Sequence, residues 1–287
     1  MRVKKGKREP INIKAVAKVL EMTWQEAFLP GVKVWDGKFT KSVKKEHKIS
    51  LCTTSMNRLK DVKRTLPKNI EDNSDYSNIE FVLLDYNSKD GLGDWVKSEM
   101  TKYIEKGILV YYRTEEPKYY DMSHSRNIAF KLATGDIVNS IDGDAYTNKG
   151  FVTFVNKLAN EQPRKAIFAK SRQLLRGRLG FYKDEFVELL GGYSEQLRGY
   201  GHDDADLLNR AWGLDFKMMA YRGTFCGGVD DHIKHQSGNY KELWWVTEGR
   251  NRFISYSNLI LEQYKANEGK EWGKARVVKN FKEEIEI

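Results

Sequence analysis

The stretch SHSRNIAFKLATGDIVNSIDGDAY, residues 123–146, decides the fold that the sequence predicts. Its first part predicts a helix that ends at Gly135, and the apolar run that follows predicts a strand. The strand ends in Asp142, Gly143 and Asp144, so two carboxylates flank one glycine. A helix followed at once by an apolar strand is typical of an α/β protein with a parallel sheet.

The same alternation precedes this stretch. Strands are predicted at residues 47–55, 79–88 and 108–114, and helices at residues 58–70 and 90–107. Strands that are apolar throughout imply a mostly parallel sheet that helices cover on both faces. Ligands of such sheets bind at the carboxyl ends of the strands. The polar groups TTSMNR, DYNS and DGD lie at those ends, which indicates a ligand site there.

The alternation weakens after residue 150, and we expect an irregular extension of the same sheet there. The main domain is assigned to residues 46–260, and residues 261–287 are predicted to form a charged, peripheral tail. Residues 1–45 are predicted to form a helical extension. Its apolar residues repeat at helical spacing: Ile13, Val16, Val19, Leu20, Trp24 and Phe28.

Composition narrows the class of protein. Of the 287 residues 40 % are hydrophobic, which is enough for a packed core. The only two cysteines, Cys52 and Cys226, exclude a disulfide framework and a cysteine-based zinc site. The sequence has no run of 18 apolar residues and no apolar signal segment, so we expect a cytoplasmic protein. The net charge of +9 indicates either a solvated basic surface or a polyanionic partner.

The two carboxylates of residues 142–144 have two interpretations. Acids this close repel each other unless a cation lies between them or they titrate apart. Carboxylate oxygens suit Mg²⁺ or Mn²⁺, and Mg²⁺ commonly bridges to substrate phosphates. The first interpretation is therefore a metal ion that binds a diphosphate. The second is a solvated turn, because Asp and Gly are ordinary turn residues.

Residues 47–255 resemble the GT-A fold glycosyltransferases, enzymes that use nucleotide-sugar donors. The resemblance rests on HKISLCTTSMNR, LLDYNSKDG and the block SRNIAFKLATGDIVNSIDGDA, which resembles the family's pattern of A-R-N, A-x-G-D and D-x-D. The stretch GYSEQLRGYGHDDAD, residues 192–206, resembles the β-1,4-galactosyltransferase and polypeptide GalNAc-transferase group. Tyr200, His202 and Ala205 depart from that group's pattern. The resemblance implies a Rossmann-like central sheet with an irregular C-terminal acceptor half.

The resemblance also implies roles for the acids. Asp144 would bind Mn²⁺ (or Mg²⁺), while Asp142 would contact the ribose or assist the metal. By its position in the family pattern His235, with His232 beside it, would complete the metal site; by spacing alone, the alternative is that both are surface histidines. Asp204 would be the general base of an inverting transfer, and Asp203 would contact the donor sugar or the acceptor. By local pattern alone, these two acids also fit a helix N-terminus.

Further residues are expected around the donor and the acceptor. The nucleotide of a UDP-sugar would be held by loop residues, with Asp85 reading a uracil N–H: Thr54, Asn57, Arg58, Asp85, Asn87, Arg126 and Asn127. Tyr200 and His202 are assigned to the donor or acceptor sugar. Trp244 and Trp245 would either stack on a sugar ring or belong to the core.

The expected function is thus a metal-dependent glycosyltransferase with a glycan acceptor. The basic charge and a faint helix-turn-helix pattern in residues 17–27 keep open a DNA-modifying glycosyltransferase that acts on hydroxymethylated bases. An inactive, transferase-like module that binds nucleic acid is a third hypothesis, which the retained acids and histidines disfavour. A nucleotidyltransferase would not account for residues 192–206.

Overall fold

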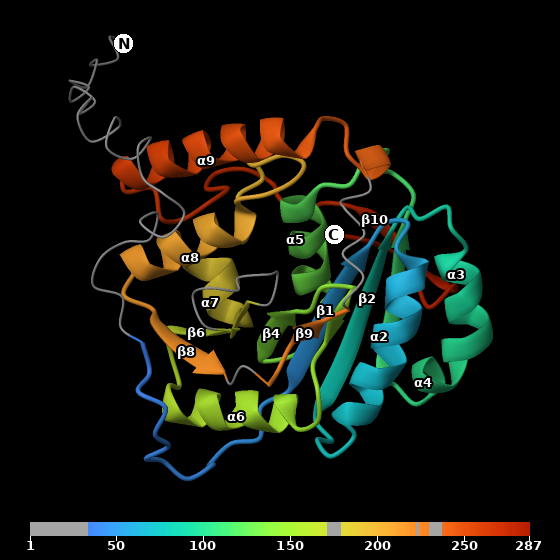
Figure 1. Ribbon diagram of the computed structural model, residues 1–287, viewed down its shortest axis with the longest axis horizontal. Helices are drawn as coiled ribbons and strands as arrows, with labels where there is room; N and C mark the ends of the chain where they lie inside the picture. The colour runs from blue at the N-terminus through green and yellow to red at the C-terminus, as the bar shows by residue number, and fades with distance from the viewer. Residues whose placement is uncertain (1–33, 171–178, 222–223, 230–236) are drawn as a thin grey trace.

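The computed structural model describes residues 34–170, 179–221, 224–229 and 237–287. Within them, a nine-stranded sheet with the order β11-β10-β3-β2-β1-β4-β7-β6-β8 forms the centre of the molecule (Figure 1). Its strands are β1 Ile49–Ser55, β2 Ile79–Tyr86, β3 Leu109–Thr114, β4 Ile137–Ser140, β6 Ala166–Lys170, β7 Gly180–Tyr182, β8 Lys217–Tyr221, β10 Arg276–Lys279 and β11 Glu283–Glu286. The predicted α/β class, with a mostly parallel sheet, is confirmed.

The middle of the sheet is parallel. β1 pairs in parallel with β2 and β4, and β2 pairs in parallel with β3. These strands are almost entirely buried, as their apolar runs predict. Their carboxyl ends therefore meet at one edge of the sheet, called the carboxyl edge below. The outer strands are mixed: β7 and β10 run antiparallel to their neighbours, whereas β6 and β8 are parallel.

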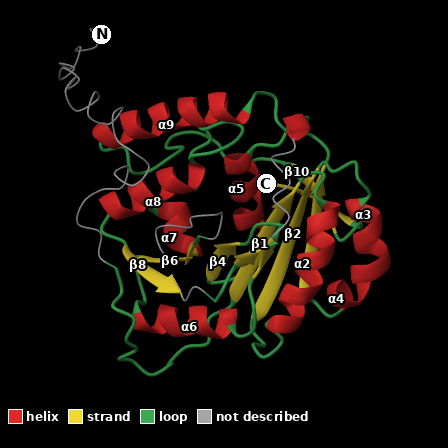
Figure 2. Cartoon of the chain, viewed as in Figure 1, coloured by secondary structure: helices red, strands yellow, loops and turns green. Residues whose placement is uncertain are grey.

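Helices cover both faces of the sheet (Figure 2). Two separate hydrophobic clusters form the core, one on each face. One face packs on α2 Leu59–Asp72, α6 Phe151–Glu161 and the segment of α3 Leu92–Trp95, η1 Val96–Met100 and α4 Thr101–Glu105. The other packs on α5 Met122–Leu132, α7 Lys183–Glu188 and α8 Asp203–Gly213. α9 Trp244–Ile260 lies against α8 (Figure 1).

The decisive stretch differs from its prediction in one respect. The strand predicted to end in Asp142, Gly143 and Asp144 ends at Ser140, and a turn at Gly143 and Asp144 follows. β5 Ala145–Tyr146 then leaves the main sheet and pairs with β9 Gly227–Gly228. The helix predicted at residues 90–107 is also divided, with a π-helical middle. In the region after residue 150, where an irregular extension of the sheet is predicted, residues 166–170 form β6 and residues 171–178 lie outside the described residues.

The two ends of the chain differ more from their predicted structure. β10 and β11, from the segment expected to be a peripheral tail, extend the main sheet, because β10 pairs with β3. Residues 1–33 of the expected helical extension lie outside the described residues. Residues 34–45 are not helical: Val34 bridges to Met218, and Trp35 is buried against the core. In the described part of the chain, helices are too short or too polar to cross a membrane.

Candidate active site

The loops after β1 and β2 meet at the carboxyl edge. Both contain an asparagine with positive φ, Asn57 at 55° and Asn87 at 64°, a conformation that asparagine tolerates better than most residues. The backbone N–H of Lys89 donates to Oδ1 of Asn57 at 2.6 Å, and the N–H of Asn57 donates to Ser88 at 3.0 Å. Asn87 donates from Nδ2 to the carbonyl of Pro117. These predicted donor residues thus also fix the shape of their own loops.

The turn with the two carboxylates packs closely on α2. Thr65 Oγ1 donates to the carbonyl of Gly143 at 2.7 Å, and a Cβ at residue 143 would lie only 3.2 Å from Val62 Cγ2. Glycine at this position therefore permits the close approach. The side chains of Asp142 and Asp144 remain 27 % and 45 % exposed. The two acids are thus held at the carboxyl edge and are accessible to a ligand.

Arg126 of α5 connects three of the predicted acids. Its side chain is 4 % exposed; Nη1 donates to Asp203 and, at 3.1 Å, to Asp204, and Nη2 lies 3.4 Å from Asp142. Burial lowers the pKa of Arg126, but Asp204 and Asp203 outweigh that effect and raise it well above its usual value. Acids from two distant segments are therefore brought together around one guanidinium.

Asp203 and Asp204 form the first turn of α8. Both are buried, and the preceding residue, His202, has a φ of 66°. Tyr193 donates from its hydroxyl to Oδ1 of Asp204 at 3.3 Å, the same oxygen that Arg126 contacts. Burial, and to a lesser extent the charge of Asp204, raise the pKa of Asp203 to about 6 against the opposing effect of Arg126. Such a carboxylate changes charge near neutral pH.

Arg58 lies on the other side of the turn. Its Nε donates to Asp61 at 2.5 Å, and its Nη2 lies 3.4 Å from Oδ2 of Asp144. The side chain is one-third exposed, so it reaches the surface of the carboxyl edge. Thr54 lies near the end of β1, and its Oγ1 shares a 2.6 Å hydrogen bond with the hydroxyl of Tyr120.

Asp85 and Asn127, two of the residues predicted to bind the donor nucleotide, are buried beneath the surface. Asp85 has no exposed side-chain area; its carboxylate accepts hydrogen bonds from the Tyr111 hydroxyl, Arg113 Nη1 and the Ser88 N–H, each at 2.7 Å. The direct uracil contact predicted for Asp85 would require rearrangement of these bonds. In this structure Asp85 holds the loop after β2 through its hydrogen bond with the Ser88 N–H, and its contact with uracil stays a prediction.

Asn127 is directed away from the other predicted residues. It is fully buried, and its amide bonds both the N–H and the carbonyl of Tyr193 as well as the carboxylate of Glu195. His202 is 6 % exposed, and its ring packs edge-on against Tyr256 of α9. Burial lowers the pKa of His202 to about 4, so this imidazole is neutral at pH 7.

Aromatic side chains that the sequence did not assign also border the site. The ring of Tyr120 contacts those of Tyr86 and Tyr240 edge-on, and Tyr240 contacts Tyr200. η3 Ser237–Asn239 joins this region to the carboxyl edge, since Asn57 donates to Asn239 at 2.8 Å. Tyr193, the partner of Asp204, lies within the stretch that carried the resemblance, so its position offered a signal. Tyr120 and Tyr240 offered none, because tyrosines are frequent throughout the chain.

The carboxyl edge has donors that suit a hard divalent cation. Asp142 and Asp144 are partly exposed carboxylates on one turn, and Mg²⁺ and Mn²⁺ bind to such oxygens together with substrate phosphates. Among the described residues, no group of three or more His, Cys, Asp or Glu side chains is arranged to hold a metal. The predicted ligands His232 and His235 lie outside the described residues.

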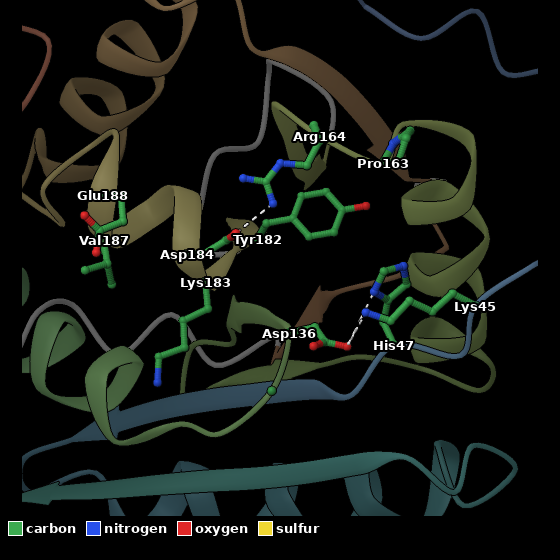
Figure 3. A pocket seen from close by; sticks show the side chains of 11 residues that line it. Lys45, His47, Asp136, Pro163, Arg164, Tyr182, Lys183, Asp184, Val187 and Glu188 are labelled. Atoms are coloured by element: carbon green, nitrogen blue, oxygen red, sulfur yellow. Dashed lines mark hydrogen bonds and ion pairs between the residues drawn. The ribbon is translucent and has the colours of Figure 1, made fainter.

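A cavity of about 580 Å³ lies at the opposite edge of the sheet, where β1 and β4 begin (Figure 3). Its charged groups are largely engaged with one another: Lys45 lies 3.2 Å from Asp136, and Arg164 lies 2.7 Å from Asp184. It contains none of the predicted site residues. The carboxyl edge, and not this cavity, therefore carries the candidate chemistry.

Comparison with known proteins agrees with this fold. The sequence model of glycosyl transferase family 2 matches residues 50–219, more than half of the chain. No functionally curated protein matches. Similar solved structures include the mannosyltransferase PcManGT from Pyrobaculum calidifontis in complex with GDP-Man and Mn²⁺, with 18 % identity and a TM-score of 0.55. Another similar solved structure is that of residues 1–349 of S. aureus TarS, with 16 % identity and a TM-score of 0.57. The complex of the same TarS segment with UDP-GlcNAc has 17 % identity and a TM-score of 0.59.

These likenesses cover part of each protein. Each of the three matches covers 77 % of this chain. The matched region spans 64 % of the PcManGT chain and 66 % of the TarS segment, which is less than two thirds of the length of either chain. It spans 67 % of the TarS segment in the UDP-GlcNAc complex. At these identities the likeness shows a common fold.

Proposed function

The chain belongs to glycosyl transferase family 2, and we propose that it transfers a sugar from a nucleotide-sugar donor to an acceptor hydroxyl at the carboxyl edge. The observation that carries this proposal is the contact of Arg126 with Asp142, Asp203 and Asp204. It joins the turn proposed to bind the donor diphosphate to the acids proposed to act on the acceptor. A UDP-sugar is the proposed donor, and the UDP-GlcNAc complex of TarS supports that choice.

We propose that Asp144, with Asp142 beside it, holds Mn²⁺ or Mg²⁺. The exposure of both carboxylates supports this assignment, as does the Mn²⁺ in the PcManGT complex. When bound, the cation would offset the negative charge of the departing nucleoside diphosphate. Arg58 would contribute a further positive charge, because its guanidinium lies 3.4 Å from Asp144. Thr54 and the loops with Asn57 and Asn87 would enclose the nucleotide.

Asp204 is proposed as the general base. It would take the proton of the acceptor hydroxyl as that oxygen bonds to the anomeric carbon and the bond from this carbon to the diphosphate oxygen breaks, so the configuration inverts. Hydrogen bonds from Arg126 and Tyr193 to Oδ1 would fix the direction of this carboxylate. Asp203 would bind the donor sugar or the acceptor, and Arg126 would keep both acids in place.

A glycan is the proposed acceptor. A DNA acceptor with hydroxymethylated bases is the second candidate, favoured by the net charge of +9. DNA binding would weaken steeply with salt, because log K falls by roughly 0.9 per phosphate contact for each unit of log salt concentration. A neutral glycan would show little salt dependence.

The test is a panel of UDP- and GDP-sugars with Mn²⁺, scored for thermal stabilisation and for donor hydrolysis. We expect one donor to stabilise the protein and to be hydrolysed slowly without an acceptor. A protein that neither binds nor hydrolyses any member of the panel would not support a nucleotide-sugar transferase.

A further inference from the structure

Five aromatic side chains form a continuous row that leads from the carboxyl edge to the surface of α9. We call this the aromatic row: Tyr120, Tyr240, Tyr200, Trp244 and Trp245. Successive ring centroids lie 5.8, 5.6, 6.3 and 5.7 Å apart, each pair in an edge-to-face arrangement. The row is therefore one packed structure and not a set of isolated surface aromatics.

The inner end of the row adjoins the candidate chemistry. Tyr120 shares a hydrogen bond with Thr54 at the end of β1. Tyr200 lies three residues before Asp203, and its backbone carbonyl accepts a hydrogen bond from Thr247 of α9 at 2.9 Å. Gly201, with a φ of 90°, follows Tyr200 and packs against Glu248. The loop that positions the two acids of α8 is thus fixed to the helix that presents the outer end of the row.

The outer end of the row is open to solvent. The side chains of Trp244 and Trp245 are 40 % and 54 % exposed, and those of Leu243 and Val246 beside them are 51 % and 46 % exposed. Large exposed aromatic groups of this kind mark binding surfaces. α9 runs along one side of the molecule, above α8 and α5 (Figure 1).

The charges next to the row indicate the class of ligand. Glu242 and Arg250 form an ion pair at 2.8 Å, and Glu248 and Arg252 form another at 3.4 Å. These two pairs balance, and the exposed Lys241 next to Glu242 adds one positive charge, which is a small excess beside the net charge of +9 of the whole chain. A surface that binds a nucleic acid or an anionic membrane needs an excess of cations, whereas a neutral ligand does not.

We propose that the aromatic row is the acceptor-binding surface and that its ligand is a neutral oligosaccharide whose sugar rings stack on these aromatic side chains. This inference rests on the proposed function, since it places the acceptor beside Asp203 and Asp204. Sugar rings have apolar C–H faces and hydroxyl rims. Tryptophan and tyrosine match both parts, because each has an apolar face and a polar group. Successive sugars would extend from the acids toward Trp245.

The test uses a defined set of neutral probes: maltohexaose, cellohexaose and chitohexaose. Binding is measured by calorimetry with the wild-type chain, Trp245→Ala and the matched control Phe253→Ala. Phe253 is also an exposed aromatic side chain of α9, at 53 %, and lies about two turns further along the helix. We expect at least one oligosaccharide to bind, Trp245→Ala to weaken it about tenfold or more, and Phe253→Ala to change it less than twofold.

Three results would overturn the inference: none of the oligosaccharides binds, both variants weaken binding equally, or a duplex with hydroxymethylated bases binds and Trp245→Ala weakens that binding instead. UDP affinity in Mn²⁺ is measured on the same samples. If UDP affinity is normal but no oligosaccharide binds as expected, only the assignment of the aromatic row as the acceptor surface is contradicted. Absence of UDP binding contradicts the proposed function itself.

Discussion

Arg126 and Asp204 are in contact at the carboxyl edge, with Nη1 and Oδ1 3.1 Å apart, although 78 residues separate them in the chain. Arg126 comes from the helix before the carboxylate turn, and Asp204 comes from the first turn of α8. The contact therefore joins the two halves of the candidate site. Both side chains are buried, so each depends on the other for charge compensation.

Replacement of Arg126 by lysine should disrupt the site. A lysine ammonium cannot reproduce a planar group that reaches three carboxylates. We expect sugar transfer to be lost. The free energy of unfolding should fall by less than the roughly 3–5 kcal/mol that complete removal of a buried partner charge costs, because the ammonium still compensates part of the negative charge. Chemical denaturation and a transfer assay measure the two effects. Wild-type stability and wild-type transfer in Arg126→Lys would show that the site does not need a planar guanidinium in contact with all three carboxylates.

The two acids of α8 should have separable roles. Asp204→Asn keeps the shape of the side chain but cannot accept a proton, so transfer should fall by roughly 10²-fold or more while donor affinity stays near normal. Asp203→Asn, which alters a contact to the donor sugar or acceptor, should change KM as well. Steady-state kinetics with both substrates separate these effects. Normal transfer by Asp204→Asn would transfer the role of base to Asp203 or exclude this mechanism.

The raised pKa of Asp203 predicts a pH-dependent contribution to stability. This carboxyl has a pKa of about 6 when folded and about 3.8 ordinarily. Between these values the folded chain holds a proton that the unfolded chain releases, so a rise in pH destabilises the folded state by at most about 1.4 kcal/mol per pH unit. The free energy of unfolding of the wild-type chain, relative to Asp203→Asn, should fall from pH 4 to pH 6 and then level off. A difference that rises over this range would contradict the assignment.

Asn127 should contribute to stability and not to donor binding. Asn127→Ala removes hydrogen bonds to Tyr193 and Glu195 and leaves buried partners without a bond. We expect a loss of about 1–3 kcal/mol in the free energy of unfolding. The UDP affinity of the folded variant should match that of the wild-type chain. A large loss of UDP affinity at unchanged stability would restore the nucleotide contact predicted from the resemblance.

The parallel sheet was predictable because its strands are apolar throughout and alternate with helices. The last two strands were not, because β11, Glu283–Glu286, is mostly exposed and highly charged and pairs only at the margin of the sheet. The end of β4 was also missed. Apolar and turn residues in Ile141–Tyr146 allowed a strand, but pairing of Ala145 with Gly228 removes β5 from the main sheet.

The acids of the site were predictable from the strand-end pattern and the resemblance, whereas the direction of single side chains was not. Arg126 and Asn127 are adjacent in sequence, yet neighbours on a helix point about 100° apart. Arg126 therefore faces the acids while Asn127 faces Tyr193. The aromatic row depends on contacts between segments more than 40 residues apart, such as Tyr200 and Trp244, which no local pattern contains.

We expect the carboxyl edge to bind a nucleotide-sugar through Asp144 and a divalent cation. The most direct test is calorimetric titration of UDP in Mn²⁺ with the wild-type chain, Asp144→Ala and the control Asp136→Ala. The control side chain is 43 % exposed, against 45 % for Asp144, and lies at the opposite edge of the sheet. We predict that Asp144→Ala loses measurable UDP affinity while Asp136→Ala retains it, and that omission of Mn²⁺ has the same effect as Asp144→Ala. Equal UDP affinity in all three proteins would show that Asp144 does not hold a cation for the nucleotide.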